Sequence, residues 1–217
     1  MLSPAELRTR LAFDYEVASR MVGRVFDLQA FASTADLAAR RNPVEDETEG
    51  HRATKYRVLF SVPTLVGPGQ FAPETEVGID LSVRGYPIAE PLTWVQSSHV
   101  PFSPHFKKGA PVCIGEIWRE ARGHMLLGSL LVHIARLLNW DEIARGGGYV
   151  GWNPAAVAYH AEVYGQGALD PDLVYPSLPL QLTHGLLAPE DLFTPRRGGG
   201  RDADGLGLFT PARRIHP

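Results

Sequence analysis

The sequence predicts an α+β fold in which the helices are separated along the chain from an antiparallel sheet. Three observations lead to this: a capped helix start near residue 3, four strand-like segments with short connections, and a strongly apolar helical segment after them. Short connections between consecutive strands favour an antiparallel meander. An apolar helix face needs a large partner, and the sheet provides one. We therefore expect one domain over residues 1–145, followed by a C-terminal extension over 146–217.

The length and composition of the chain are those of a globular protein. Its 217 residues, 44% of them hydrophobic, are enough for one domain of about 150 residues and an extension. The formal net charge of -3 gives no indication of a nucleic-acid or membrane partner. No apolar run approaches the roughly 18 residues that a membrane span needs, and the first residues lack the plan of a signal peptide. We therefore expect a cytoplasmic protein.

The first element is a helix with a clear N-terminal cap. Ser3 can accept a hydrogen bond from the third helical backbone N–H, Glu6 can reach back to the Ser3 amide, and Pro4 fits the first helical position. Apolar residues then recur at roughly helical spacing: Leu7, Leu11, Val17 and Met21. This pattern predicts a helix from Pro4 to about Met21, ended by Gly23.

Four segments with the composition or alternation of strands follow: 25–31, 56–62, 76–83 and 92–99. The polar, charged stretch 34–54 is interpreted as a loop or insertion with a short helix at 35–40. Gly67, Pro68 and Gly69 mark the connection between the second and third strands as turn-rich. The four strands are expected to form a single meander.

The segment Gly123–Leu138 is predicted to be a long helix with one broad apolar face. Its apolar residues recur at helical spacing: Leu126, Leu127, Leu130, Leu131, Ile134, Leu137 and Leu138. Asn153 and Pro154 have the types expected at the cap and the first position of a further helix, which we extend to about Tyr164. From there the chain is rich in Pro and Gly, and its composition near residue 200 is typical of a mobile segment.

Cys113 is the only cysteine of the chain. It cannot form an internal disulfide, and without a cysteine cluster there is no indication of zinc. The small, stiff stretch 109–111 before it suits an extended peptide that passes beside the thiol. Two interpretations remain open from the residues alone. The thiol is either an exposed nucleophile or a small apolar side chain buried beside Val112 and Ile114.

Over residues 3–142, the order of elements resembles that of the ubiquitin-conjugating enzyme (UBC) family. Local motifs agree: Tyr86-Pro87 followed by Pro91, Ser103-Pro104-His105 at the place of the family's His-Pro-Asn, Gly109 just before the cysteine, and Cys113-Ile114 followed by Trp118. The resemblance implies a UBC-like fold. It also implies that Cys113 accepts a ubiquitin-like protein from an activating enzyme as a thioester and transfers it to a lysine of a target protein.

One motif position departs from the family pattern, because His105 stands where the family has Asn. The long charged stretch after the first strand is also unusual. Both features resemble the bacterial branch, whose members are encoded beside a ubiquitin-like protein, an activating enzyme and a deubiquitinase-like metalloprotease, often in anti-phage operons. The resemblance implies these proteins as partners. We expect neither a metal nor a cofactor.

His105 is the second candidate catalytic residue. In the place of the family Asn, it is expected to donate a hydrogen bond to the tetrahedral oxyanion or to hold the loop in shape. Imidazole groups exchange protons near neutral pH, so it could also assist deprotonation of the incoming amine. His99 and His124 are further candidates near the loop. Asp141 and Glu142 follow the long helix, where the resemblance implies an acidic residue beside the entering lysine.

Three functions are consistent with these residues. The first is a conjugating enzyme that forms a thioester, which requires an exposed Cys113 thiol. The second is a catalytically inactive UBC-like module that binds a ubiquitin-like protein or another partner, and it predicts a buried Cys113. The third is an unrelated cysteine hydrolase with Cys113 and His105 as a dyad, although no third orienting group is evident.

Overall fold

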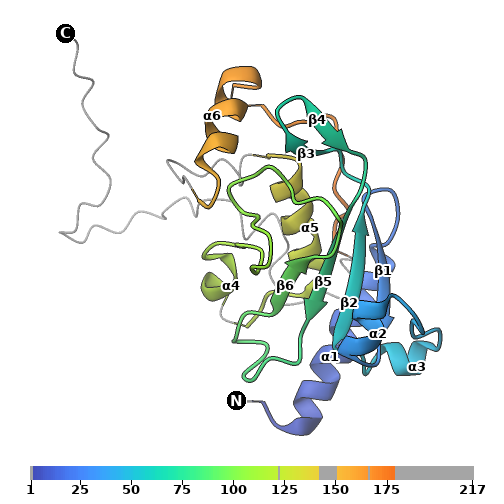
Figure 1. The fold of residues 1–217 in the computed structure, drawn as a ribbon. Helices are drawn as coiled ribbons and strands as arrows, with labels where there is room; N and C mark the ends of the chain where they lie inside the picture. Colours follow the sequence, from blue (N-terminus) through green and yellow to red (C-terminus); the bar gives the residue numbers. More distant parts are fainter. Residues whose placement is uncertain (1, 122, 142–150, 166, 179–217) are drawn as a thin grey trace, which may run out of the picture.

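The computed structural model describes residues 2–121, 123–141, 151–165 and 167–178, and it confirms the predicted α+β class (Figure 1). A four-stranded antiparallel sheet has the order β1-β2-β5-β6, so strands that follow one another in this list also pair. The strands are β1 (Phe26–Phe31), β2 (Lys55–Phe60), β5 (Thr75–Asp80) and β6 (Leu92–Val95). The predicted meander is thus present, with the last strand at a sheet edge.

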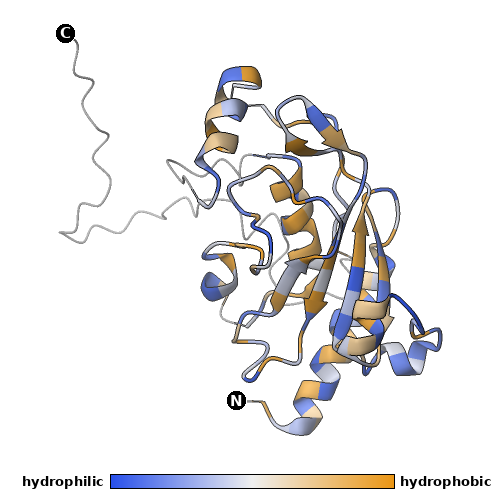
Figure 2. Ribbon diagram, in the orientation of Figure 1, coloured by the Kyte–Doolittle hydropathy of each residue, from blue (hydrophilic) through white to orange (hydrophobic). Residues whose placement is uncertain are grey.

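Two helices pack together against this sheet. They are α1 (Pro4–Arg20) and α5 (Leu127–Leu138), and their buried side chains form one core cluster with those of the strands. Every residue of α5 except Arg136 is buried. Figure 2 accordingly shows α5 as hydrophobic over most of its visible length. Such a helix cannot stay in water, so the leucine-rich segment is held on the sheet by burial of its side chains.

The helix boundaries follow the caps that the sequence provides. At the start of α1, the Ser3 amide donates to Glu6 Oε2 at 2.7 Å and the Glu6 amide donates to Ser3 Oγ at 3.3 Å, which is the predicted capping box. The helix ends at Arg20 with Met21 as its C-cap, two residues before Gly23. Asn153 likewise caps α6 (Pro154–Val163), as predicted.

Several elements differ from the sequence-based expectation. The turn-rich connection forms a small hairpin of β3 (Thr64–Gly67) and β4 (Gln70–Ala72). The charged insertion contains α2 (Thr34–Ala39), close to the predicted short helix, and also α3 (Glu47–Gly50). A further short helix, α4 (Ile117–Glu120), follows the cysteine loop, and α5 begins four residues after the predicted Gly123. Gly123 itself has a φ of +84°, which a continuing right-handed helix does not allow.

The predicted domain boundary near residue 145 lies outside the described residues. The predicted mobile segment near residue 200 also lies outside them. Within the ranges that the structure describes, no helix is both long and apolar enough to cross a membrane.

Candidate functional site

Cys113 lies in an extended segment whose start is paired with the edge strand β6. Pro111 forms an isolated antiparallel bridge with Trp94 in β6, and the Val112 amide donates to the Thr93 carbonyl at 2.9 Å. Backbone pairing to β6 therefore aligns the residues just before the cysteine.

Side chains alternate between core and surface along this segment. Val112 and Ile114 are 2% and 1% exposed and belong to the core cluster, whereas Cys113 between them is partly exposed. In an extended chain, neighbouring side chains point to opposite sides, so burial of both neighbours turns the cysteine outward. The second interpretation of the sequence, a thiol buried beside these two residues, is therefore wrong.

His105 is bound to the cysteine through the backbone. The Cys113 amide donates to the His105 carbonyl at 2.9 Å, and the His105 ring Nδ1 lies 2.9 Å from the Cys113 carbonyl oxygen. A carbonyl oxygen only accepts hydrogen bonds, so Nδ1 carries the proton of this contact. The two residues are eight apart in sequence, and the pair of contacts closes the loop between them into a fixed shape.

A second histidine, His133, contacts the next carbonyl. Its Nε2 lies 3.0 Å from the Ile114 carbonyl oxygen, and the residue is 3% exposed in the middle of α5. Burial lowers the pKa of His133 to about 3, although the Ile114 hydrogen bond opposes this. The sequence interpretation missed this residue. Its only signal was an imidazole within a run of leucines, which is more often a core residue without a functional role.

Two further groups of contacts hold the loop that carries His105. The buried Ser103 hydroxyl accepts from the His105 amide at 3.4 Å. From the segment before α6, the Trp152 amide donates to the Pro104 carbonyl at 3.0 Å. The Trp152 ring also lies 5.2 Å from Lys107 Nζ, a cation–π contact. The Ser-Pro-His motif is therefore built into the structure through its backbone as well as its side chains.

The remaining candidates occupy other places. His99 Nε2 lies 3.2 Å from Thr75 Oγ1 and lines a polar pocket of about 250 Å³ with Arg40 and Glu76. His124 is exposed and lines an apolar cavity of about 770 Å³ beside α1. Asp141 follows α5 and pairs with Arg136, with 3.5 Å between Oδ2 and Nε.

Glu142 lies outside the described residues. Of the sequence-predicted candidates, the structure thus brings Cys113 and His105 into contact. It places His99 and His124 in two separate pockets.

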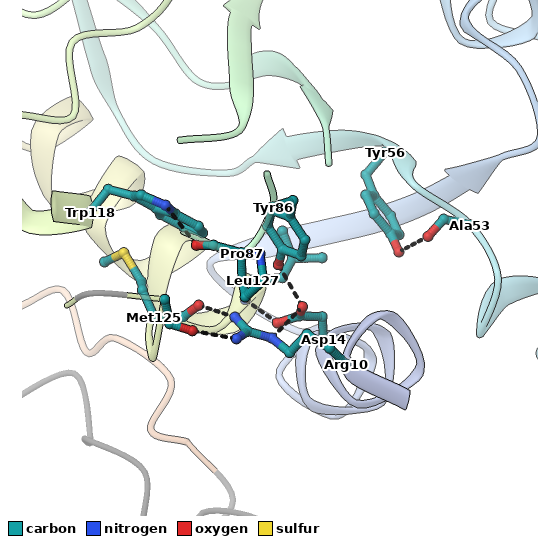
Figure 3. A network of polar contacts seen from close by, with 10 residues as sticks. Arg10, Asp14, Ala53, Tyr56, Tyr86, Pro87, Trp118, Met125 and Leu127 are labelled. Atoms are coloured by element: carbon teal, nitrogen blue, oxygen red, sulfur yellow. Dashed lines mark hydrogen bonds and ion pairs between the residues drawn. The ribbon is translucent and has the colours of Figure 1, made fainter. Parts of the chain in front are cut away.

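A buried charge network supports the region around the site (Figure 3). Asp14 in α1 is fully buried and accepts from Arg10 Nε at 2.8 Å, from the Tyr86 hydroxyl at 2.5 Å and from the Leu127 amide at 2.9 Å. Burial raises the pKa of Asp14, while Arg10 and these hydrogen bonds oppose that rise. Arg10 also donates to the carbonyls of Gly123 and Met125. The network thereby connects α1 to the start of α5.

Tyr86 and Pro87, whose sequence resembles a UBC-family motif, take part in this support. Tyr86 donates to Asp14, and the Pro87 carbonyl accepts from Trp118 Nε1 at 3.1 Å (Figure 3). Trp118 is fully buried in α4, four residues after Ile114. These motif residues therefore fix the far end of the cysteine loop, which is a structural role.

The site thus has a partly exposed thiol on a backbone segment that is held by hydrogen bonds to β6, His105 and His133. In the ranges that the structure describes, no group of three or more His, Cys, Asp or Glu residues could hold a metal ion. No protein-family model matches the sequence, and a search of curated proteins finds no significant match. The function is therefore argued from the site itself.

Proposed function

We propose that the protein is a conjugating enzyme of the UBC type that carries a ubiquitin-like protein as a thioester on Cys113. The observation that supports this most is the partly exposed cysteine between the buried Val112 and Ile114, on a segment that bridges the edge strand of an antiparallel meander. The order of helix, meander, cysteine segment and sheet-packed helix agrees with it. As in the bacterial branch, we place the pathway in anti-phage defence.

The chemistry consists of two acyl transfers. The Cys113 thiolate attacks the thioester carbonyl of the loaded activating enzyme, and the thiolate of that enzyme leaves. A lysine amine of the target then attacks the new thioester and forms an amide bond, its proton passes to solvent, and the C–S bond breaks as the Cys113 thiolate leaves. The fixed backbone around Cys113 presents the sulfur in one orientation, so little conformational entropy is lost when the acyl chain arrives.

His105 supports the second transfer in this proposal. Its Nδ1 proton is engaged by the Cys113 carbonyl, which orients the imidazole beside the cysteine backbone. This geometry favours the loop-ordering role over that of a proton acceptor through Nδ1. Asp141 stays a candidate for the entering lysine on the basis of the resemblance alone.

The test is a loading assay with an activating enzyme and a ubiquitin-like protein of the bacterial branch, together with ATP. We expect a thiol-sensitive adduct on a non-reducing gel. Cys113→Ala should abolish it, and Cys113→Ser should replace it with a thiol-resistant ester. Absence of any adduct with wild-type protein, when the activating enzyme itself is charged, would exclude the function.

A second candidate is an inactive UBC-like module that binds a ubiquitin-like protein, although the buried Cys113 that such a module predicts is not what the structure has. The engagement of the His105 Nδ1 proton by the backbone favours it, because that proton is then not directed at an oxyanion. It predicts that Cys113→Ala preserves binding of the ubiquitin-like protein and leaves the output of the pathway unchanged. The loading assay and a binding measurement on the same variant separate the two functions.

A further inference from the structure

Two imidazoles contact two consecutive backbone carbonyls at the cysteine. His105 Nδ1 lies 2.9 Å from the Cys113 carbonyl oxygen, and His133 Nε2 lies 3.0 Å from the Ile114 carbonyl oxygen. His105 belongs to the loop before the cysteine, whereas His133 belongs to α5, an almost wholly buried helix. The contact made by His133 therefore ties the cysteine segment to the core of the domain.

The donor in the second contact is the His133 ring. The Ile114 carbonyl can only accept, so Nε2 carries a proton, and in the neutral ring Nδ1 carries none. Burial lowers the pKa of His133 to about 3, so the ring is neutral at physiological pH and keeps this single tautomer. A neutral donor at a fixed position on a helix suits a permanent structural bond rather than a proton-transfer step.

This bond holds the backbone of the residue that follows the cysteine. Ile114 is buried, and its carbonyl, the group that His133 contacts, comes directly before Gly115. Gly115 turns the chain with a φ of +70°. Removing the donor would take away the hydrogen bond that this buried carbonyl receives from His133, and the cost of that loss would favour rotation of the peptide. Rotation of the Ile114 peptide would move the adjacent cysteine out of its alignment.

We propose that His133 is a positioning residue for Cys113, whose Nε2–H holds the Ile114 carbonyl inward and so keeps the neighbouring thiol in its outward, reactive orientation. That loss of this bond would impair acyl transfer rests on the proposed function. That it would change the reactivity of the thiol does not, since a small alkylating reagent measures this reactivity directly. His133 itself touches no reacting atom in this role.

The test compares the rate of alkylation of Cys113 by iodoacetamide across pH 6 to 10 in the full-length chain. His133→Leu removes the donor and fills the space, and His133→Gln keeps an N–H at a similar reach. Ser129→Ala is the matched control, because Ser129 is buried on α5 one turn earlier. Thermal melts of each variant define temperatures at which it is folded.

We expect His133→Leu to change the alkylation rate by about tenfold, the factor that corresponds to 1.4 kcal/mol, or to shift the pH profile of the rate. His133→Gln and Ser129→Ala should stay near wild type. If His133→Leu matches wild type in both rate and profile, or if His133→Gln changes as much as His133→Leu, the proposal is wrong. Loading assays on the same variants then show whether the rate of acyl transfer changes together with the alkylation rate of the thiol. If loading fails in the wild-type protein as well, that result counts against the proposed function and not against the role of His133.

A measurement on the wild-type protein keeps the proposal falsifiable where His133→Leu does not fold. With ¹⁵N-labelled histidine, NMR identifies which ring nitrogen of His133 is protonated. The proposal requires the Nε2–H tautomer, unchanged between pH 8 and 6. An Nδ1–H tautomer would overturn it, because Nε2 could then not donate to the Ile114 carbonyl.

Discussion

The carboxylate of Asp14 in α1 accepts a hydrogen bond from the backbone amide of Leu127, the first residue of α5, at 2.9 Å. The first amides of a helix have no partner within the helix, and the N-cap of α5, Leu126, has no side chain that could serve them. A residue from another helix thus performs the capping. The negative charge also lies at the positive end of the helix dipole, where it is favourable.

The first prediction concerns the charge pair behind this cap. Arg10→Ala leaves Asp14 buried without its cation, and we expect a loss of about 3 kcal/mol in the free energy of unfolding. Urea denaturation measures it. The control is Glu16→Ala, which breaks the exposed pair with Arg20 on the same helix at the same spacing and should cost less than about 0.5 kcal/mol. Equal losses of stability in the two variants would show that burial of the Arg10–Asp14 pair does not increase the cost of breaking it.

A second prediction concerns close packing between β5 and β6. Gly78 lies opposite Trp94 in the register, and a Cβ added to Gly78 would lie 2.5 Å from Trp94 Cε2. Gly78→Ala must therefore displace the indole, and we expect a cost of about 1–3 kcal/mol by chemical denaturation. Gly23→Ala serves as the comparison, because nothing lies within 4 Å of its added Cβ. Its effect should stay within about 0.5 kcal/mol.

Trp94 also bridges Pro111, two residues before the cysteine. The displacement in Gly78→Ala should therefore reach the cysteine segment, and the alkylation rate of Cys113 should change in this variant while Gly23→Ala leaves it unchanged. An unaltered rate in a clearly destabilised Gly78→Ala would show that β6 does not align the cysteine.

The third prediction is a dependence of stability on pH. The pKa of His133 is about 3 in the folded protein and near 6.5 in the unfolded chain, so the unfolded chain binds this proton first as the pH falls. Stability from this group is complete above pH 6.5 and is lost below it, by up to about 1.4 kcal/mol per pH unit. Urea denaturation at pH 7.5, 6.5 and 5.5 measures the slope. His133→Gln, which has no titrating ring, should reduce it; an identical slope would contradict the assignment.

The fourth prediction, which depends on the proposed function, separates the two transfers. His105→Ala removes the ring that contacts the Cys113 carbonyl, whereas His105→Asn keeps an N–H donor, and Asn is the residue of the motif that this segment resembles. We expect discharge of the thioester to lysine to fall about tenfold or more in His105→Ala and to be retained better in His105→Asn. Loading should change less than discharge in both. Single-turnover assays measure the two steps; equal losses would assign His105 to the thiol itself.

Local sequence signals predicted local structure well. Ser3 and Glu6 predicted the start of α1 because the capping box lies within four residues, and the alternation of the third strand-like segment predicted β5. The β3–β4 hairpin was missed because its strands are short and the sequence shows mainly the turn, Pro68-Gly69. Short helices such as α4 carry too few residues for a periodic pattern.

Features that depend on distant contacts could not be predicted. The start of α5 was placed four residues early because its cap comes from Asp14, 113 positions earlier in the chain. The helical period extends back to Leu126, so the pattern itself gave no reason to stop. The contact of His133 is likewise with a carbonyl 19 positions earlier. The outward direction of Cys113 followed from neither its type nor its apolar neighbours, since both are compatible with burial.

The alternation at the cysteine has a consequence for the length of the loop. Because Val112 points inward and Cys113 outward from the bridge at Pro111, one extra residue between Pro111 and Val112 would exchange the two sides. The sulfur would then lie on the buried side of the segment and a valine on its exposed side. Solvent therefore reaches the sulfur only when the cysteine keeps its place in the two-residue alternation. An insertion of two residues should preserve this exposure, and an insertion of one should abolish it.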